Sequence, residues 1–235
     1  MKTKYYIPLF ILSVIFILSS CNSDKYKKSG EIEQRIIFQN YAVSYNAGTE
    51  KLDVKASFTV NNPSGISLSL NNESEVIFNG KSLDGDYYDD EGYIYHDEFD
   101  GKLPSELLLQ YRNNDDNIFD NRLKINKFEI KNPERLVISK SAGAMLNYWG
   151  AAFSDDEVLL CTLMKGEKSV ATLEPGIRSS EKVEFTSGLL TDVPIGAYEC
   201  YFTRTLTSSD VRSMDRGGWY SSEYISKKIK IIITE

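Results

Sequence analysis

The 235-residue sequence predicts an all-β protein. Apolar and polar residues alternate with a period of two in several segments, which is the pattern of a strand with one buried face. Helical periodicity is nearly absent. Gly, Asn, Asp and Pro recur between the apolar runs at intervals of roughly 8 to 15 residues, a spacing typical of antiparallel sandwiches and barrels.

In the first half of the chain, the clearest strand spans 52–60, where Leu, Val, Ala and Phe alternate with Asp, Lys, Ser and Thr. A second apolar run at 75–78 leads into Asn79-Gly80, a dipeptide that strongly favours a tight hairpin. The same reasoning predicts further strands at 67–70, 93–99, 106–111 and 122–130.

Asn132-Pro133 follows a predicted strand and is the expected domain boundary. The roughly 205 residues after position 30 could form one large sandwich, or two domains of about 100 residues that are each large enough for a core. We therefore expect two tandem antiparallel β-sandwich domains, at 31–132 and 133–235. Strands of the second domain are expected at 136–139, 158–164, 170–173, 182–186, 196–205 and 223–234.

The most specific fold signal is the spacing of Asp192, Gly196, Tyr198 and Cys200. It resembles the corner before strand F of immunoglobulin-like domains, where a tyrosine two residues before the cysteine hydrogen-bonds back across the turn. Asp192 lies four residues before Gly196 rather than two, and no tryptophan follows Cys161 at the strand C position. The resemblance therefore implies an immunoglobulin-like or fibronectin-like sandwich and not an antibody-type domain.

The N-terminus has the features of a bacterial export signal. Lys2 and Lys4 precede an apolar run at 5–18 that is too short to span a membrane. The run ends in Leu18-Ser19-Ser20-Cys21, which resembles the lipobox of bacterial lipoproteins. The alternative is an ordinary signal peptide with a chance cysteine.

The lipobox resemblance implies cleavage after residue 20, acylation of Cys21, and attachment to the membrane through the N-terminal lipid. Residues 1–20 are then the signal peptide, and 21–30 are the lipidated cysteine and a flexible polar tether. With its sandwich domains, the chain resembles uncharacterised cell-adhesion lipoproteins of Gram-negative bacteria. Asn22 after the lipidated cysteine favours the outer membrane of the cell envelope, with the membrane face left open.

The composition excludes several function classes. The formal net charge is −7, whereas a nucleic-acid-binding protein needs a basic face for phosphates. His96 is the one histidine, so no Ser-His-Asp or Cys-His mechanism can be built elsewhere. We find no candidate catalytic residues and expect a non-enzymatic protein.

Cys161 and Cys200 are the two cysteines that remain when Cys21 is lipidated. Each alternates with apolar neighbours, so both are expected to face inward in a compartment that permits disulfides. The resemblance to immunoglobulin-like domains implies a Cys161–Cys200 bridge between the two sheets. The alternative is a pair of buried, reduced thiols.

An acidic segment at 84–100 includes Asp84, Asp86, Asp89 and Asp90. Calcium prefers six to eight oxygen ligands, which clustered carboxylates can supply. The spacing does not match an EF-hand, so a solvated hairpin is the alternative. No other cofactor is expected.

Two aromatic clusters are candidates for ligand binding. Trp219 and Tyr220 end a polar loop, and Trp149 precedes a polar segment. Aromatic residues beside polar groups can bind a sugar ring or a partner protein, and loops at the end of a sandwich often carry recognition. Packing in the core is the alternative for each.

These observations favour a cell-envelope lipoprotein that acts as an adhesion or ligand-binding module for a glycan or a protein. The alternative is a periplasm-facing structural or assembly lipoprotein that pairs through an exposed strand edge, with 223–234 as the candidate strand. A glycan hydrolase ranks third. Neither the ligand nor the oligomeric state is predicted.

Overall fold

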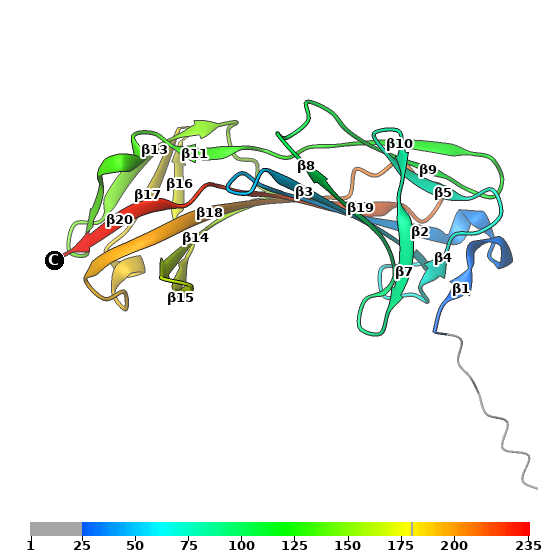
Figure 1. The fold of residues 1–235 in the computed structure, drawn as a ribbon, viewed down its shortest axis with the longest axis horizontal. Coiled ribbons are helices and arrows are strands. Elements are labelled where there is room, and N and C mark those ends of the chain that lie inside the picture. Colours follow the sequence, from blue (N-terminus) through cyan, green and yellow to red (C-terminus); the bar gives the residue numbers. More distant parts are fainter. Residues whose placement is uncertain (1–24, 180) are drawn as a thin grey trace, which may run out of the picture.

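A computed structural model describes residues 25–179 and 181–235 (Figure 1). The predicted signal peptide, the lipidated Cys21 and the start of the tether lie outside these residues. The described chain is all-β, as predicted, with 3-10 turns as its helical elements. In these ranges no helix is long and apolar enough to cross a membrane.

The strands form one large sheet and three small ones. The large sheet has the order β12 (Leu136–Ser139), β20 (Ile229–Thr234), β18 (Gly196–Ser208), β19 (Gly218–Ile225), β2 (Ile37–Asn46), β3 (Lys51–Val60), β8 (Gly92–Asp100), β7 (Asp84–Tyr88), with β14 (Glu157–Lys165) beside β18 and β15 (Lys168–Leu173) beside β14. One small sheet has the order β10 (Ile118–Leu123), β9 (Leu107–Arg112), β5 (Glu75–Phe78), β6 (Lys81–Ser82). Another has the order β11 (Phe128–Ile130), β13 (Ala144–Gly150), β17 (Lys182–Phe185), β16 (Gly176–Ser179). The remaining elements are β1 (Lys27–Lys28), which pairs with β4 (Leu68–Ser69), and the 3-10 turns η1 (Ser29–Glu31), η2 (Gln34–Ile36), η3 (Pro133–Arg135) and η4 (Gly188–Leu190).

The two four-stranded sheets cover the same face of the large sheet, one near each end (Figure 1). Phe58 of β3 packs on Tyr111 of β9 with ring centroids 4.5 Å apart, and Phe128 of β11 packs on Phe202 of β18 at 5.0 Å. Each half of the molecule is therefore a two-layer β-sandwich. The buried residues of both halves form one continuous core.

The halves share the large sheet. β19 pairs in parallel with β2 along eight residues, from Gly218 opposite Gln39 to Ile225 opposite Asn46, and it also pairs with β18. β11, which precedes the expected boundary at 132, pairs with β13 beyond it. The boundary itself stays a prediction. Two features were not expected: one sheet runs through both halves, and some of its strands pair in parallel.

A buried ion pair contacts residues 124–127, the segment that connects β10 in one half to β11 in the other. The Arg204 and Glu157 side chains are 0% exposed, and Arg204 Nε and Nη2 donate to the Glu157 carboxylate at 2.8 and 2.7 Å. The guanidinium also donates to the carbonyls of Ala151 at 2.8 Å, Ala152 at 3.0 Å and Lys127 at 3.3 Å. All five guanidinium N–H groups thus have acceptors, which offsets the cost of burying the charge.

Two local predictions are confirmed. The Tyr198 hydroxyl donates to the Pro194 carbonyl at 2.7 Å, so the tyrosine corner is present. Asn79 and Gly80 have φ values of 45° and 84° and join β5 to β6 as a two-residue loop. Positive φ at both positions is the requirement of a type I′ hairpin turn.

Residues 25–30 of the predicted tether are bound to the body. The Tyr26 ring contacts the rings of Tyr87 and Tyr93, with centroids 5.4 and 5.1 Å away. Ser29 is fully buried, and its hydroxyl hydrogen-bonds to Ser74 at 2.7 Å. Aromatic packing and buried hydrogen bonds therefore fix a segment whose polar composition predicts flexibility.

Candidate functional site

Among the residues that the structure describes, none forms a layer over the second face of the large sheet between β15 and β7 (Figure 1). Because side chains alternate along each strand, every second residue of the central strands points to this open face. One row runs across four strands and places Trp219, Asn40, Ser57 and Ile94 side by side. These residues lie far apart in the sequence and meet only through strand pairing.

Two adjoining hollows of about 250 and 160 Å³ mark this end of the open face. They share Lys55, Glu91 and Ile94, and we refer to them together as the Trp219 groove. The side chains that reach the groove come from β19, β2, β3 and β8 and from the end and turn of β7. They are Trp219, Ser221, Asn40, Ala42, Asp53, Lys55, Ser57, Ile94, His96, Tyr88 and Glu91.

Exposed aromatic rings stand at the two ends of the Trp219 groove. Trp219 is 45% exposed, and its ring packs nearly perpendicular to the Phe38 ring at a centroid distance of 6.1 Å. Tyr88 is 43% exposed at the other end. A large apolar surface that is held in place but remains in water is a feature of binding sites.

Polar side chains form the floor between the rings. The Asn40 Oδ1 atom is buried and has no hydrogen-bond partner within residues 25–179 and 181–235. A buried acceptor without a donor costs free energy, which a ligand hydroxyl would recover. Lys55 and Glu91 lie 3.8 Å apart, and His96 Nε2 lies 2.8 Å from Asp53 Oδ2.

The charge around the Trp219 groove is acidic on balance. Asp53 and Glu91 face Lys55 and His96 in the groove, while Asp84 and Asp86 lie on β7 opposite His96 and Ile94. Carboxylates on the rim repel anionic ligands. The charge of the groove therefore disfavours anionic ligands.

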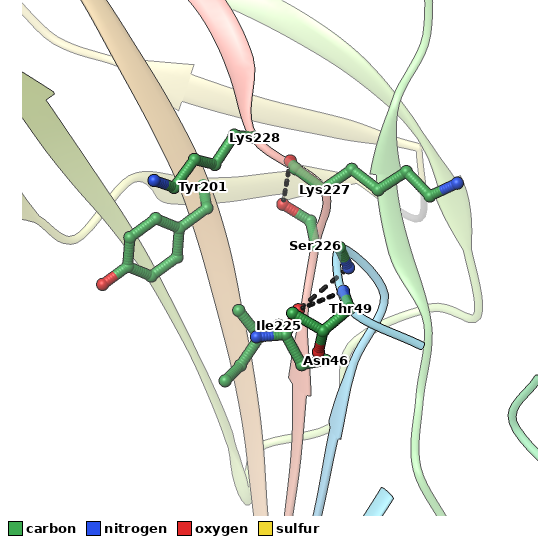
Figure 2. A pocket seen from close by; sticks show the side chains of 8 residues that line it. Asn46, Thr49, Tyr201, Ile225, Ser226, Lys227 and Lys228 are labelled. Carbon is green, nitrogen blue, oxygen red and sulfur yellow. Dashed lines mark hydrogen bonds between the residues drawn. The ribbon is translucent and has the colours of Figure 1, made fainter. Parts of the chain in front are cut away.

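A second hollow, of about 550 Å³, lies where the two halves meet (Figure 2). Two of its polar side chains already have partners: Asn46 Oδ1 accepts from the N–H groups of Gly48 and Thr49, and the Ser226 hydroxyl donates to the Lys227 carbonyl. Unlike the Trp219 groove, this hollow offers no unpaired buried acceptor among the described residues. The Trp219 groove is therefore the stronger candidate.

The three aromatic residues singled out from the sequence do not form one site. Trp219 lies on strand β19 rather than in a loop. Tyr220 points to the other face and is 6% exposed, so it is a core residue and cannot contact a ligand, and burial raises its pKa. Trp149 is 64% exposed on β13 of a different sheet, with the Lys131 ammonium 4.0 Å above its ring.

The four predicted calcium ligands are not gathered around a point. Asp84 and Asp86 lie on β7, and Asp89 and Asp90 lie in the turn after it. Asp89 is paired with Lys25 at 2.6 Å. Within the described residues, the group of three close metal-type ligands is Asp53, His96 and Glu98, which includes none of the four.

Cys161 and Cys200 are buried free thiols on the neighbouring strands β14 and β18. Cys161 is opposite Phe202, and Cys200 is opposite Leu163, so the two cysteines are diagonal neighbours within one sheet. The expected bridge between two facing sheets is therefore not the arrangement observed. A hydrogen bond with Cys200 and burial raise the pKa of the Cys161 thiol well above its ordinary value.

Asn40, Ser57 and Tyr88 line the groove but were not predicted from the sequence as site residues. Asn40 lies in β2, a strand that was not predicted from the sequence. Ser57 alternates with buried residues of the predicted strand 52–60, so its outward direction was readable. Its proximity to Trp219 depends on pairing across β2, for which no local signal exists.

No protein-family model and no curated protein matches the chain. SGBP-B of the Bacteroides ovatus mixed-linkage glucan utilization locus, solved with a mixed-linkage heptasaccharide, is 14% identical, with a TM-score of 0.25. That match covers 90% of this chain, which spans 47% of the Bacteroides ovatus chain.

Two other solved structures are similar at the same low level. Fibronectin(III)-like modules of Clostridium thermocellum CbhA are 11% identical over 80% of this chain and 94% of theirs, with a TM-score of 0.20. A 1.5-MDa bacterial ice-binding adhesin is 9% identical over 84% of this chain and 65% of its own, with a TM-score of 0.23. At this level of similarity, these structures assign no function to the chain.

Proposed function

We propose that this protein is a non-enzymatic glycan-binding lipoprotein of the bacterial cell envelope. The observation that carries the proposal is the pairing of an exposed tryptophan with an unpartnered buried acceptor. Trp219 and Asn40 are cross-strand neighbours on the open face of a rigid sheet. This combination fits a ligand that has both apolar faces and hydroxyl groups.

Each part of a sugar has a counterpart in the groove. The flat face of the Trp219 indole packs against the C–H face of a pyranose ring, an apolar contact that removes area from water. Sugar hydroxyls donate to Asn40 Oδ1 and exchange hydrogen bonds with Ser57 and Ser221. Because these residues project from paired strands, little conformational entropy is lost when the sugar binds.

The shape of the groove favours an internal segment of a linear chain. From β19 to β8 there are three strand spacings, or about 14 Å, and Tyr88 continues the groove beyond β8. Several sugar rings in line fit this length, with Trp219 and Tyr88 as the end platforms. The acidic rim favours neutral polysaccharides over uronic-acid or sulfated ones.

The lipobox resemblance supplies the proposed location. Lipidation at Cys21 would leave three residues between the anchor and Lys25, the first described residue. The body would then lie close to the outer membrane rather than at the end of a long tether. Protease treatment of intact and lysed cells tests the membrane face: digestion of the body on intact cells supports surface exposure, and protection until lysis contradicts it.

The alternative assembly role loses its main support in the structure. The segment 223–234 is divided between β19 and β20, and β20 is paired on both sides, with β12 and with β18. It therefore offers no free edge to a partner strand.

Affinity electrophoresis on neutral polysaccharides tests the proposed function, with β-glucans, xylan, mannan and soluble chitin in the gel. We expect retardation of the wild type by at least one of these polymers and its loss in Trp219→Ala. Trp149→Ala is the matched control, because it removes an exposed tryptophan outside the groove. Equal retardation of both variants, or no retardation of the wild type, contradicts the proposal.

A further inference from the structure

We propose that Asp53, His96 and Glu98 bind a divalent transition-metal ion of the zinc type. The three residues lie on the open face, on the adjacent strands β3 and β8, and their ligand atoms are all within 4.8 Å of one another. The proposal is independent of glycan binding, and the ion alone is sufficient to test it.

The donor set fits zinc better than calcium. Imidazole nitrogen and carboxylate oxygen are both common zinc ligands, and an open zinc site takes three protein ligands and water. Calcium needs six to eight oxygens, more than these residues supply. His96, the single histidine of the chain, therefore supplies the nitrogen ligand that favours zinc over calcium.

The strand register brings the ligands together without backbone movement. Asp53 is directly opposite Glu98, and His96 precedes Glu98 by two residues on the same face. Like charges directly opposite each other destabilise a strand pair, and a cation between them removes that repulsion. The hollow of about 160 Å³ over Asp53 and His96 has room for an ion and its waters.

Two lysines compete for the carboxylates of this face. Lys51 Nζ lies 3.2 Å from Glu98 and 4.0 Å from Asp100, so it keeps a carboxylate partner when Glu98 turns to the metal. Lys55, directly opposite His96, is paired with Glu91 at 3.8 Å. Two ligand atoms that each lie about 2.1 Å from one ion are no more than about 4.2 Å apart. The present ligand atoms lie within 4.8 Å of one another, so a small rotation of the half-exposed Glu98 side chain brings them within this limit.

Calorimetric titration of the tag-free, EDTA-treated body, residues 22–235, with zinc chloride tests this site. We expect saturable one-to-one binding by the wild type and at least tenfold weaker binding by His96→Gln and by Asp53→Asn. Asp97→Asn is the matched control, because Asp97 lies between His96 and Glu98 in sequence but is bound to Lys81. This control variant should bind zinc like the wild type.

Circular dichroism melting without metal shows that each variant is folded, and calcium chloride serves as the non-cognate ion. The proposal is overturned by absence of saturable zinc binding in the wild type, by unchanged affinity in a folded His96→Gln variant, or by an equal response to calcium. None of these outcomes depends on whether the Trp219 groove binds a glycan.

Discussion

Replacing Arg204 by methionine should cause one of the larger stability losses in this chain. The substitution keeps much of the side-chain length but removes all five N–H donors from a site that is 0% exposed. It leaves the Glu157 carboxylate buried with its remaining donors, which are the Ser154 N–H at 2.9 Å, the Ser154 hydroxyl at 3.3 Å and the Asn126 amide at 2.8 Å. It also leaves three backbone carbonyls without their donor.

Removing one partner of a buried ion pair costs about 3–5 kcal/mol. We therefore expect Arg204→Met to lower the free energy of unfolding by about 4 kcal/mol. At about 2–4 °C per kcal/mol for a chain of this size, the melting temperature falls by roughly 8–16 °C. Arg122→Met is the matched control, because Arg122 and Glu106 form an exposed ion pair at 2.9 Å. Its loss should cost less than about 1 kcal/mol.

Urea unfolding followed by circular dichroism measures both variants and the double variant Arg204→Met/Glu157→Leu. Because the double variant removes the orphaned carboxylate as well, it should be more stable than Arg204→Met alone. A loss below about 1 kcal/mol for Arg204→Met, similar to that of Arg122→Met, would refute the account of the buried pair.

Three further outcomes follow from the structure. Tyr198→Phe removes the hydrogen bond to the Pro194 carbonyl and should cost about 1 kcal/mol in urea unfolding; an unchanged midpoint would show that the corner adds nothing. Burial raises the pKa of Glu157, but hydrogen bonds from Arg204, Ser154 and Asn126 outweigh it and leave the pKa below its usual range. The stability from this group is therefore present above its unfolded-state pKa and is lost as the pH falls through the folded one. The stability advantage of the wild type over Glu157→Gln should accordingly shrink between pH 5 and pH 3, and a constant gap contradicts this. Non-reducing intact mass should show Cys161 and Cys200 as two free thiols that react with a thiol reagent only after unfolding; a mass lower by two hydrogens would restore the disulfide that the sequence suggests.

Local patterns predicted much of the secondary structure. The ranges 75–78 and 136–139 coincide with β5 and β12, and the tyrosine corner was readable from residue spacing. β2 was not predicted because its two faces are mixed in character. Gln39 is buried on the inner face, where its side chain accepts from Tyr41, and Phe38 points outward.

Long-range pairing could not be predicted from one sequence. The parallel contact between β19 and β2 joins residues about 180 positions apart, and no local turn or spacing encodes it. In the candidate site, too, local features could be predicted and long-range neighbours could not. Trp219 was recognisable as an aromatic residue beside a polar loop, whereas Asn40 and Ser57 become its neighbours only through that pairing.

The fluorescence of Trp219 reports directly on whether a sugar stacks on its ring. The chain has two tryptophans, so in the Trp149→Phe variant the emission comes from Trp219 alone. Titration of that variant with neutral oligosaccharides of the polymer that retards the wild type should shift the emission to the blue and saturate, because a stacked sugar excludes water from the ring. Asn40→Ala in the same background should weaken the binding. Glycan binding that leaves the Trp219 emission unchanged would place the ligand elsewhere and contradict the account.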